Sequence, residues 1–308
     1  MSNVGKSINT SPKQEASMHS KNFSYTAFLC LNVLLALSNH AQAAPDSVAN
    51  LPSIFTRMGQ WLGIVPPTPK TAAAVVAAPC DKPVYLTFDT GDMEIAPLVA
   101  EILNKHQVPV TFFVSNEKTK DGKDSMSFDW GQKFWALRGK EGHEFASRTW
   151  DEVAWRSDAP GLEVRFVVQP GMGAFAGRSF TWEAAKYCAQ IAQSRDRLED
   201  FIGKKALPLW RAPGGASSAK LVAAAKACGY QIVPASGVVQ VEDAVLAGVI
   251  ANANAGSMLS AQLGSARQPR WAATNLEPLI VGIKERGLCF ATLRNHPGYK
   301  PWITAQGQ

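Results

Sequence analysis

Histidine is scarce in this chain, and the scarcity limits the metal chemistry that the chain can support. The 308 residues include five histidines, two of which lie before residue 44. The other three are His106, His143 and His296, and no two of them stand at the short spacing that pairs of metal ligands use. A zinc site built on histidines is therefore not expected.

Three other features are missing. The net charge of +6 is modest, and no block of Lys or Arg interleaves with aromatic residues, so nucleic acid is not an expected partner. No Gly-x-Ser-x-Gly turn is present, which argues against a metal-free serine esterase. No two cysteines are close in sequence, which argues against a cysteine metal cluster. With 46% apolar and 18% charged residues, the chain has the composition of a globular protein.

The N-terminal region lacks an apolar run long enough to cross a bilayer. Residues 25–37 carry no charge, but a spanning helix needs ~20 residues. Lys13 and Lys21 precede this run, and Ala41-Gln42-Ala43 follows it as a small-x-small cleavage site. We therefore predict a secretion signal over residues 1–43, with a membrane anchor as the alternative. The protein is expected to be exported, either periplasmic or secreted, with no stable transmembrane anchor after cleavage.

From residue 80 onward, short apolar runs alternate with segments of helical period. Residues 44–79, rich in Pro and Ala, are predicted to be a linker before a domain of residues 80–308. Strands are expected at 84–88, 108–114, 143–147, 207–211, 231–235, 257–262 and 288–293. Helices are expected at 94–106, 132–139, 181–202, 220–228, 241–251 and 276–286, the third of them capped by Thr181. The alternation predicts a parallel sheet with helices outside, and about seven strands fit a distorted, incompletely closed (β/α) barrel. Residues 151–180 have no clear period and are expected to form an inserted loop or small hairpin.

The most informative stretch is Tyr85-Leu86-Thr87-Phe88-Asp89-Thr90-Gly91. A strand of apolar and β-branched residues ends on a carboxylate, followed by a turn-forming Thr-Gly. An acid at the C-terminal end of a parallel strand is where α/β barrels place their chemistry. The stretch resembles the Thr-Phe-Asp-Asp-Gly motif of the polysaccharide deacetylases, the NodB-homology family or carbohydrate esterase family four. The resemblance implies that Asp89 is the general base, and that Thr90 stands where the family has a metal-binding Asp.

A second motif resembles that family's Gly-His-Glu followed by His-Thr/Ser-x-x-His. Residues 142–152 read Gly-His-Glu-Phe-Ala-Ser-Arg-Thr-Trp-Asp-Glu. The two metal-binding histidines of the family fall on Arg148 and Glu152. Arginine stays protonated and cannot ligate a metal, whereas Glu152 could. His143 matches a family position that is not a ligand, and a structural role at the start of its strand is expected.

Two more motifs complete the resemblance. Trp210-Arg211-Ala212-Pro213-Gly214-Gly215 resembles the family's Arg-x-Pro-x-Gly, whose Arg holds the catalytic Asp in its charged form, so Arg211 and Asp89 are expected to pair. The family's final motif ends a strand on a His that acts as general acid. Residues 256–264 fit this motif with Gln262 at the histidine, and glutamine cannot deliver a proton near neutral pH. The resemblance covers residues 80–296.

Several residues near these motifs are expected to bind substrate. Trp150, Pro213 and Gln262 are expected to contact substrate, and several tryptophans in expected loops could stack on sugar rings or pack in the core: Trp130, Trp150, Trp155 and Trp271.

The four cysteines after residue 43 suggest disulfides in an exported protein, and three connectivities are possible. Cys80 precedes the first expected barrel strand and Cys289 starts the last one. Closing a barrel brings those two strands together, so Cys80–Cys289 with Cys188–Cys228 is the preferred pairing. Four buried free thiols are the alternative.

Together the motifs predict an exported polysaccharide-deacetylase-like protein that binds or acts on N-acetylated cell-wall or extracellular glycan. Because the metal ligands and the general acid are replaced, hydrolysis of the carbon–nitrogen bond is expected to be weakened or lost, and no cofactor is expected. One alternative keeps hydrolysis: Asp89, Asp92, Asp151 and Glu152 would form an all-oxygen site for a harder cation such as manganese. Retained activity would require a divalent metal, zinc or manganese. The other alternative is a non-catalytic envelope protein that binds a protein partner.

Overall fold

The computed structural model describes residues 80–241, 244–264 and 271–308. The predicted signal segment 1–43 and the linker 44–79 lie outside these residues. Within the described part of the chain, no helix is both long and apolar enough to cross a membrane.

Strand β1 (Pro83–Asp89) is the central strand of the domain, and its side chains alternate between the helical layer and the barrel interior. Val84, Leu86 and Phe88 belong to the large apolar cluster that also contains helix residues, so they face outward to the helices. The alternate residues point into the barrel. Tyr85 lies in a separate apolar cluster at the start of the strand, and Thr87 and Asp89 follow it as buried polar residues. The interior therefore changes from apolar to charged toward the C-terminal end of β1.

The main sheet consists of parallel strands, as the alternation of elements predicts. The order is β8-β7-β3-β2-β1-β10-β9, and β11 also pairs with β1. The bounds are β2 Thr111–Val114, β3 Glu144–Ser147, β7 Leu209–Trp210, β8 Gln231–Ile232, β9 Val238–Gln240, β10 Met258–Gln262 and β11 Cys289–Phe290. All seven expected strands are present, and β9 is an additional short one. Among the described residues β8 and β9 do not pair with each other, so hydrogen bonds do not close the barrel there.

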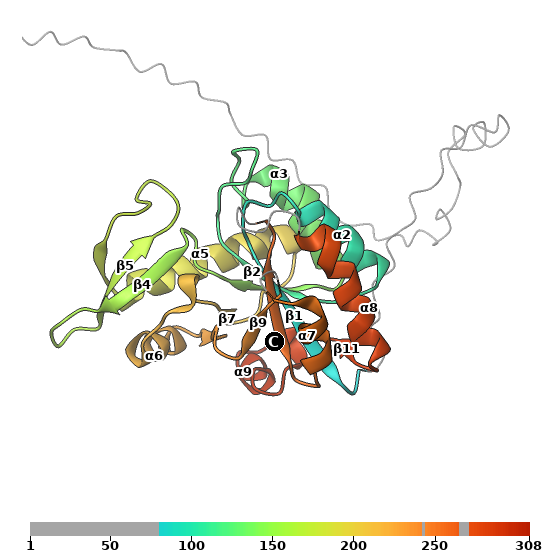
Figure 1. Cartoon of the computed structure of the whole chain (residues 1–308). Coiled ribbons are helices and arrows are strands. Elements are labelled where there is room, and N and C mark those ends of the chain that lie inside the picture. The colour runs from blue at the N-terminus through green and yellow to red at the C-terminus, as the bar shows by residue number, and fades with distance from the viewer. Residues whose placement is uncertain (1–79, 242–243, 265–270) are drawn as a thin grey trace, which may run out of the picture. The chain divides into compact units, whose positions relative to one another are not determined.

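Helices cover the outer face of the sheet, where Val84, Leu86 and Phe88 of β1 would otherwise meet water (Figure 1). Their bounds are α2 Ala96–Lys105, α3 Phe128–Trp130, η1 Gly131–Trp135, α4 Ala136–Lys140, α5 Ala184–Ile202, α6 Ala219–Ala227, α7 Leu246–Asn252, η3 Ala272–Leu276, α8 Glu277–Glu285 and α9 Lys300–Ala305; η2 Pro213–Gly215 and η4 Leu293–Asn295 are single 3₁₀ turns. Lys105 on α2 is 2.6 Å from Glu277 at the start of α8, so these two helices lie side by side.

The expected inserted segment is a three-stranded antiparallel sheet that we call the arm. It contains β4 (Val153–Asp158), β5 (Arg165–Pro170) and β6 (Phe180–Glu183), and it projects beside α5 and α6 (Figure 1). Thr181 was expected to cap the following helix, but it lies in β6 opposite Val167. Pairing with β5 extends the strand to Glu183, so α5 begins only at Ala184.

Two disulfides join the cysteines in the preferred pairing. Cys80–Cys289 ties the segment before β1 to β11, and Cys188–Cys228 ties α5 to the end of α6. The first bridge spans 209 residues and the second 40. Both bridges therefore link elements that are also packed together in the fold.

Candidate functional site

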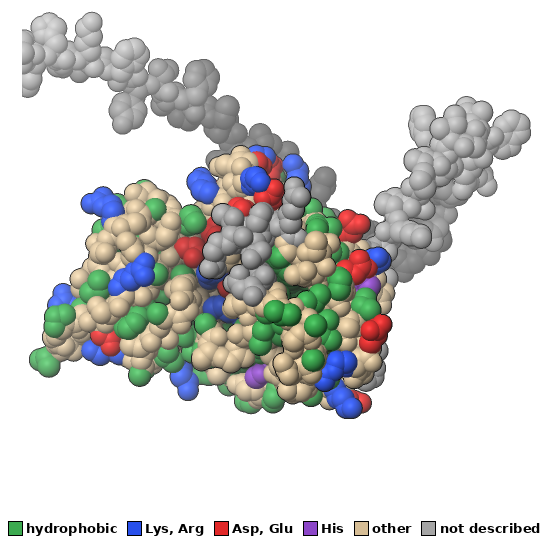
Figure 2. All heavy atoms as spheres, in the orientation of Figure 1, with side chains coloured by type: hydrophobic (Ala, Val, Ile, Leu, Met, Phe, Trp, Pro, Cys, Tyr) green, Lys and Arg blue, Asp and Glu red, His purple; other side chains and the backbone are tan. Residues whose placement is uncertain are grey.

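Four parallel strands bring the sequence-predicted site residues to one end of the barrel, which we call the mouth. Asp89 ends β1, Arg148 follows β3, Arg211 follows β7, and Gln262 ends β10 directly opposite Asp89. The carboxyl ends of parallel strands meet at the same edge of a sheet, so residues from distant motifs converge there. Figure 2 shows acidic and basic side chains close together in the recess between the arm and the rest of the barrel.

The expected pair of Asp89 and Arg211 is present. Arg211 Nη1 donates to Asp89 Oδ1 at 2.5 Å and to Ser260 Oγ at 2.9 Å, and Nη2 donates to Thr87 Oγ1 at 3.0 Å. The guanidinium also lies 4.0 Å from the centre of the Phe113 ring. Burial lowers the pKa of Arg211, and the Asp89 carboxylate opposes this shift. Arg211 is thus a buried cation with partners fixed on three strands.

Arg148 occupies the other side of Asp89. Its Nη1 donates to Asp89 Oδ2 at 2.7 Å, and its Nε lies 2.7 Å from Glu152 Oε1. The side chain of Arg148 is only 10% exposed. Both oxygens of Asp89 therefore accept from a guanidinium, one from each arginine, and Arg148 bridges the two carboxylates at the mouth.

Glu152 is brought inward by unusual backbone geometry. Thr149 and Glu152 both have positive φ values, 65° and 53°, which non-glycine residues adopt rarely. Two hydrogen bonds hold this turn: Ser147 Oγ accepts from the Thr149 N–H, and Thr149 Oγ1 accepts from the Val153 N–H. The turn after β3 thereby returns a carboxylate to the barrel mouth four residues after Arg148.

Sequence reasoning missed two residues of this network, Ser115 and Glu117. Ser115 Oγ lies 2.7 Å from Thr90 Oγ1, 2.9 Å from Glu117 Oε1 and 3.1 Å from Glu152 Oε1. Its buried hydroxyl therefore connects the ends of β1 and β2 to Glu152. The signal that could have identified Ser115 is its position directly after a buried apolar strand, where the other site residues also stand.

Burial and a neighbouring carboxyl change the protonation of Glu152. Burial raises the pKa of Glu152 to about 8, and Glu117 contributes to the rise while Arg148 opposes it. The hydrogen bond between the two carboxyl groups favours a protonated Glu152 because a carboxylate beside another carboxylate is disfavoured. The mouth thus holds two arginines, Asp89, and a pair of glutamates that retains a proton up to mildly alkaline pH.

A hollow of about 580 Å³ lies beside this network. Its walls come from the loop after β2, from the turn after β3 and from the arm after β5, and they include Asn116, Lys118, Trp150, Asp151 and Met172. Trp150 is partly buried, and its carbonyl accepts from the Asn116 N–H at 2.8 Å. An aromatic ring with amide, ammonium and carboxylate groups around it is suited to a small polar ligand.

The other expected substrate contacts are placed differently. Pro213 lies two residues after Arg211, is buried and begins the 3₁₀ turn. The backbone carbonyl of Gln262 accepts from the indole N–H of Trp271 at 3.4 Å. Trp271 itself is 3% exposed and stacks on Phe88, so it is a core residue. Trp155 bonds to Asp158 within the arm.

The four carboxylates of the all-oxygen alternative do not gather. Asp92 Oδ1 accepts from the Glu94 N–H, and the backbone of Asp151 is held by Gln190. Asp89 and Glu152 approach each other only across Arg148. In the part of the chain that the structure describes, no group of three His, Cys, Asp or Glu residues is placed to hold a metal ion.

The three histidines among the described residues lie away from the mouth network. His143 is buried, accepts from the Val110 N–H through Nδ1 and packs edge-on to Phe112. Burial lowers the pKa of His143, and this fits the expected structural role. His106 bonds to Glu277 on the helical layer, and His296 packs between Tyr85 and Tyr299.

Comparison with known proteins identifies the class. The family model of polysaccharide deacetylase matches residues 77–233. The chain therefore belongs to the polysaccharide deacetylase family.

Solved structures share the fold at low sequence identity. The Bc1960 peptidoglycan N-acetylglucosamine deacetylase is 23% identical over 71% of this chain and 89% of its own, with a TM-score of 0.51. Bacillus subtilis PdaA, a family 4 carbohydrate esterase, is 20% identical over 70% and 81%, with a TM-score of 0.50. A family 4 acetyl xylan esterase from Clostridium thermocellum, in complex with a cobalt ion, is 18% identical over 73% and 91%, with a TM-score of 0.50. No curated protein matches the chain significantly.

Proposed function

We propose that this protein is an exported glycan-binding member of the polysaccharide deacetylase family in which metal-dependent hydrolysis is weakened or lost. The observation that carries the proposal is the position of Arg148, whose guanidinium nitrogens lie 2.7 Å from an oxygen of Asp89 and 2.7 Å from an oxygen of Glu152. The cation between these two acids is therefore the guanidinium of Arg148, a side chain of the protein itself.

The residues at the mouth do not fit a catalytic metal. A divalent cation held by Asp89 and Glu152 would need the volume and the carboxylate oxygens that Arg148 uses. Thr90, a third position where the resemblance implies a ligand, bonds to Ser115 instead. Catalytic zinc sites have three protein ligands and an open position for water, and this arrangement offers neither.

The proton-transfer groups are also altered. Both oxygens of Asp89 are engaged by arginines, so Asp89 is poorly placed to take a proton from water. Gln262 stands opposite Asp89 and can donate hydrogen bonds but no proton. We therefore infer that this chain retains the recognition of N-acetylated glycan, while the deacetylation that is the activity of its family is weakened or lost.

Recognition is proposed to use the hollow beside the network. A sugar ring would pack on Trp150, while Asn116, Lys118 and Asp151 offer donors and acceptors for hydroxyl and acetamido groups. Export is supported by the two disulfides, because such bonds persist in oxidising compartments.

The test combines binding, metal content and turnover on the purified protein. We expect an N-acetylglucosamine tetramer to bind, no stoichiometric metal by elemental analysis, and no acetate release with added zinc or manganese. A variant that carries Thr90→Asp, Arg148→His, Glu152→His and Gln262→His restores the residue types that the resemblance implies, and it should gain zinc or cobalt binding. Chelator-sensitive acetate release by the unaltered protein would contradict the proposal.

A further inference from the structure

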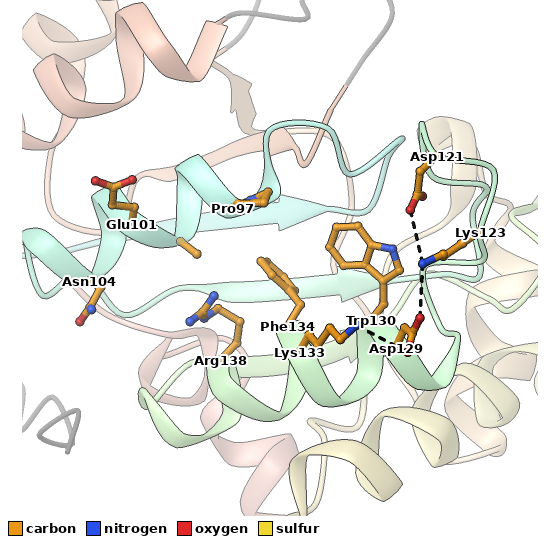
Figure 3. Close-up of a pocket in the computed structure, with 11 residues that line it drawn as sticks. Pro97, Glu101, Asn104, Asp121, Lys123, Asp129, Trp130, Lys133, Phe134 and Arg138 are labelled. Carbon is orange, nitrogen blue, oxygen red and sulfur yellow. Dashed lines mark hydrogen bonds and ion pairs between the residues drawn. The ribbon is translucent and has the colours of Figure 1, made fainter. Parts of the chain in front are cut away.

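A second hollow lies on the outside of the barrel, between α2 and the helical segment α3–η1–α4. It has a volume of about 470 Å³, within the range of sites for small ligands. Figure 3 shows Trp130 and Phe134 pointing from this segment across to α2, with Asp121, Lys123 and Asp129 grouped near the indole. We call this hollow the outer groove. None of its lining residues belongs to the mouth network.

The floor of the outer groove is aromatic. Trp130 is partly buried and packs against the main core, and its ring centre lies 5.6 Å from that of Phe134. Phe134 is in turn covered by the guanidinium of Arg138 at 5.1 Å. These contacts fix the orientation of the indole, so a ligand that packs on it meets a rigid surface at little entropic cost.

The rim of the outer groove is rich in charge but balanced. Three acidic side chains and three basic ones line it: Glu101, Asp121, Asp129, Lys123, Lys133 and Arg138. Lys123 lies 3.8 Å from Asp121 and 3.3 Å from Asp129, so the charges near Trp130 already pair with each other. A balanced rim does not attract an anionic polymer or an anionic lipid surface. It presents donors and acceptors side by side, which suits a neutral ligand with many hydroxyl groups.

The same loop lines both hollows. Lys118 and Asp124 face the hollow at the mouth, whereas Asp121 and Lys123 face the outer groove. Lys118 and Asp124 pair as a bridge and an ion pair at 2.7 Å, which holds the loop as a narrow turn between the two hollows. A long ligand bound at the mouth could therefore cross one turn of chain to reach Trp130.

We propose that the outer groove is a second binding site for neutral oligosaccharide, with one sugar ring packed on Trp130 and its hydroxyls bonded to Asp129 and Lys123. This site extends the proposed function, because contact with both hollows would favour a polymeric glycan over a short fragment. It does not depend on whether hydrolysis is retained at the mouth.

The test reads both sites in one titration. Protein labelled with ¹⁵N at tryptophan is titrated with an N-acetylglucosamine tetramer, and the indole signals are assigned with Trp130→Phe and Trp150→Phe. We expect the Trp130 signal to shift as sugar is added. A shift of the Trp150 signal alone overturns the outer site and leaves the mouth site intact. A shift of Trp130 alone supports the outer site and counts against glycan binding at the mouth.

A surface variant tests the rim without altering the core. The side chain of Asp129 is 51% exposed, and Asp129→Ala should weaken binding at Trp130 about tenfold through lost charged hydrogen bonds. The matched control is Asp196→Ala, an aspartate on α5 that is 61% exposed and lies outside both hollows, which should leave the affinity unchanged. Equal affinity of the Asp129 variant and the control would overturn the proposal for the rim and, with it, the site.

Discussion

Asp89 and Glu152 are both carboxylates at the mouth of one barrel, but their surroundings differ. Asp89 accepts from Arg211 and from Arg148, so two cations surround one anion. Glu152 shares Arg148 with Asp89 and has Glu117 beside it, so two acids compete for one cation. The comparison shows that two arginines neutralise Asp89, whereas Glu152, which has only a share of Arg148, depends on a proton.

The largest effect is expected from Arg211→Ala. This change leaves Asp89 buried with one of its two cations gone and exposes the hydroxyls of Thr87 and Ser260 to an empty cavity. Loss of one partner of a buried ion pair costs about 3–5 kcal/mol, and urea unfolding should report a decrease of this size. The control is Arg178→Ala on the exposed arm, which should change stability by less than about 0.5 kcal/mol.

Arg148→Ala should have a smaller effect, because Asp89 keeps Arg211. We expect a loss of about 1–3 kcal/mol in urea unfolding, the usual range for breaking a buried polar network. Without the Arg148 cation, which opposes the rise, the pKa of Glu152 should rise further. A loss equal to that of Arg211→Ala would show that the two arginines contribute equally to stability. It would contradict the view that Arg211 is the main partner of Asp89 and that Arg148 is shared with Glu152.

Glu152→Gln tests the dependence on a proton. A carboxyl whose pKa is raised in the folded state binds more protons when folded, so stability falls as the pH rises from about 5 through 8. The melting temperature of the unaltered protein should fall over this window, and the variant should lose most of that slope. A difference of about 1 kcal/mol corresponds to a shift of about 2–4 °C in a domain of this size. Parallel pH profiles for both proteins would refute the raised pKa.

Ser115→Ala should have the smallest effect on stability. It removes a hydroxyl that contacts Thr90, Glu117 and Glu152, and a single hydrogen-bonding group contributes about 0.5–1.5 kcal/mol. The pH profile of the melting temperature should also change, because the hydroxyl lies between the two glutamates. Thr119→Ala on the neighbouring loop is the control, since its hydroxyl bonds to Asp121 and to Lys123 and not to the network. An unchanged pH profile would place Ser115 outside the titrating unit.

Much of the fold could be predicted from the sequence because its signals are local. The period of residues 94–106 and the apolar run of residues 108–114 each occur within one element, and the structure has α2 and β2 there. The pairing of Cys80 with Cys289 followed from the positions of the first and last strands. Thr181 was wrongly assigned as a helix cap, because pairing with β5 places it in a strand. Strand β9 was missed, because it forms only through pairing with β10.

A contact within the site could be predicted only where two motifs together imply it. The pairing of Arg211 with Asp89 is expected from two motifs and is present. The substitution at Arg148 was visible, but its bridge to Glu152 depends on the positive φ values of Thr149 and Glu152, for which these residue types carry no signal. Glu117 lies in a loop without a period, so nothing in the sequence brings it to Glu152.

The bridge between Cys80 and Cys289 turns almost the whole described chain into one covalent ring. The tip of the arm is the most exposed apolar point of the described residues, with Leu162 fully exposed between β4 and β5. A protease that cuts the backbone once at this tip would open the ring without separating its two parts. The nicked protein should therefore run as a single species on a denaturing gel until a reductant divides it in two.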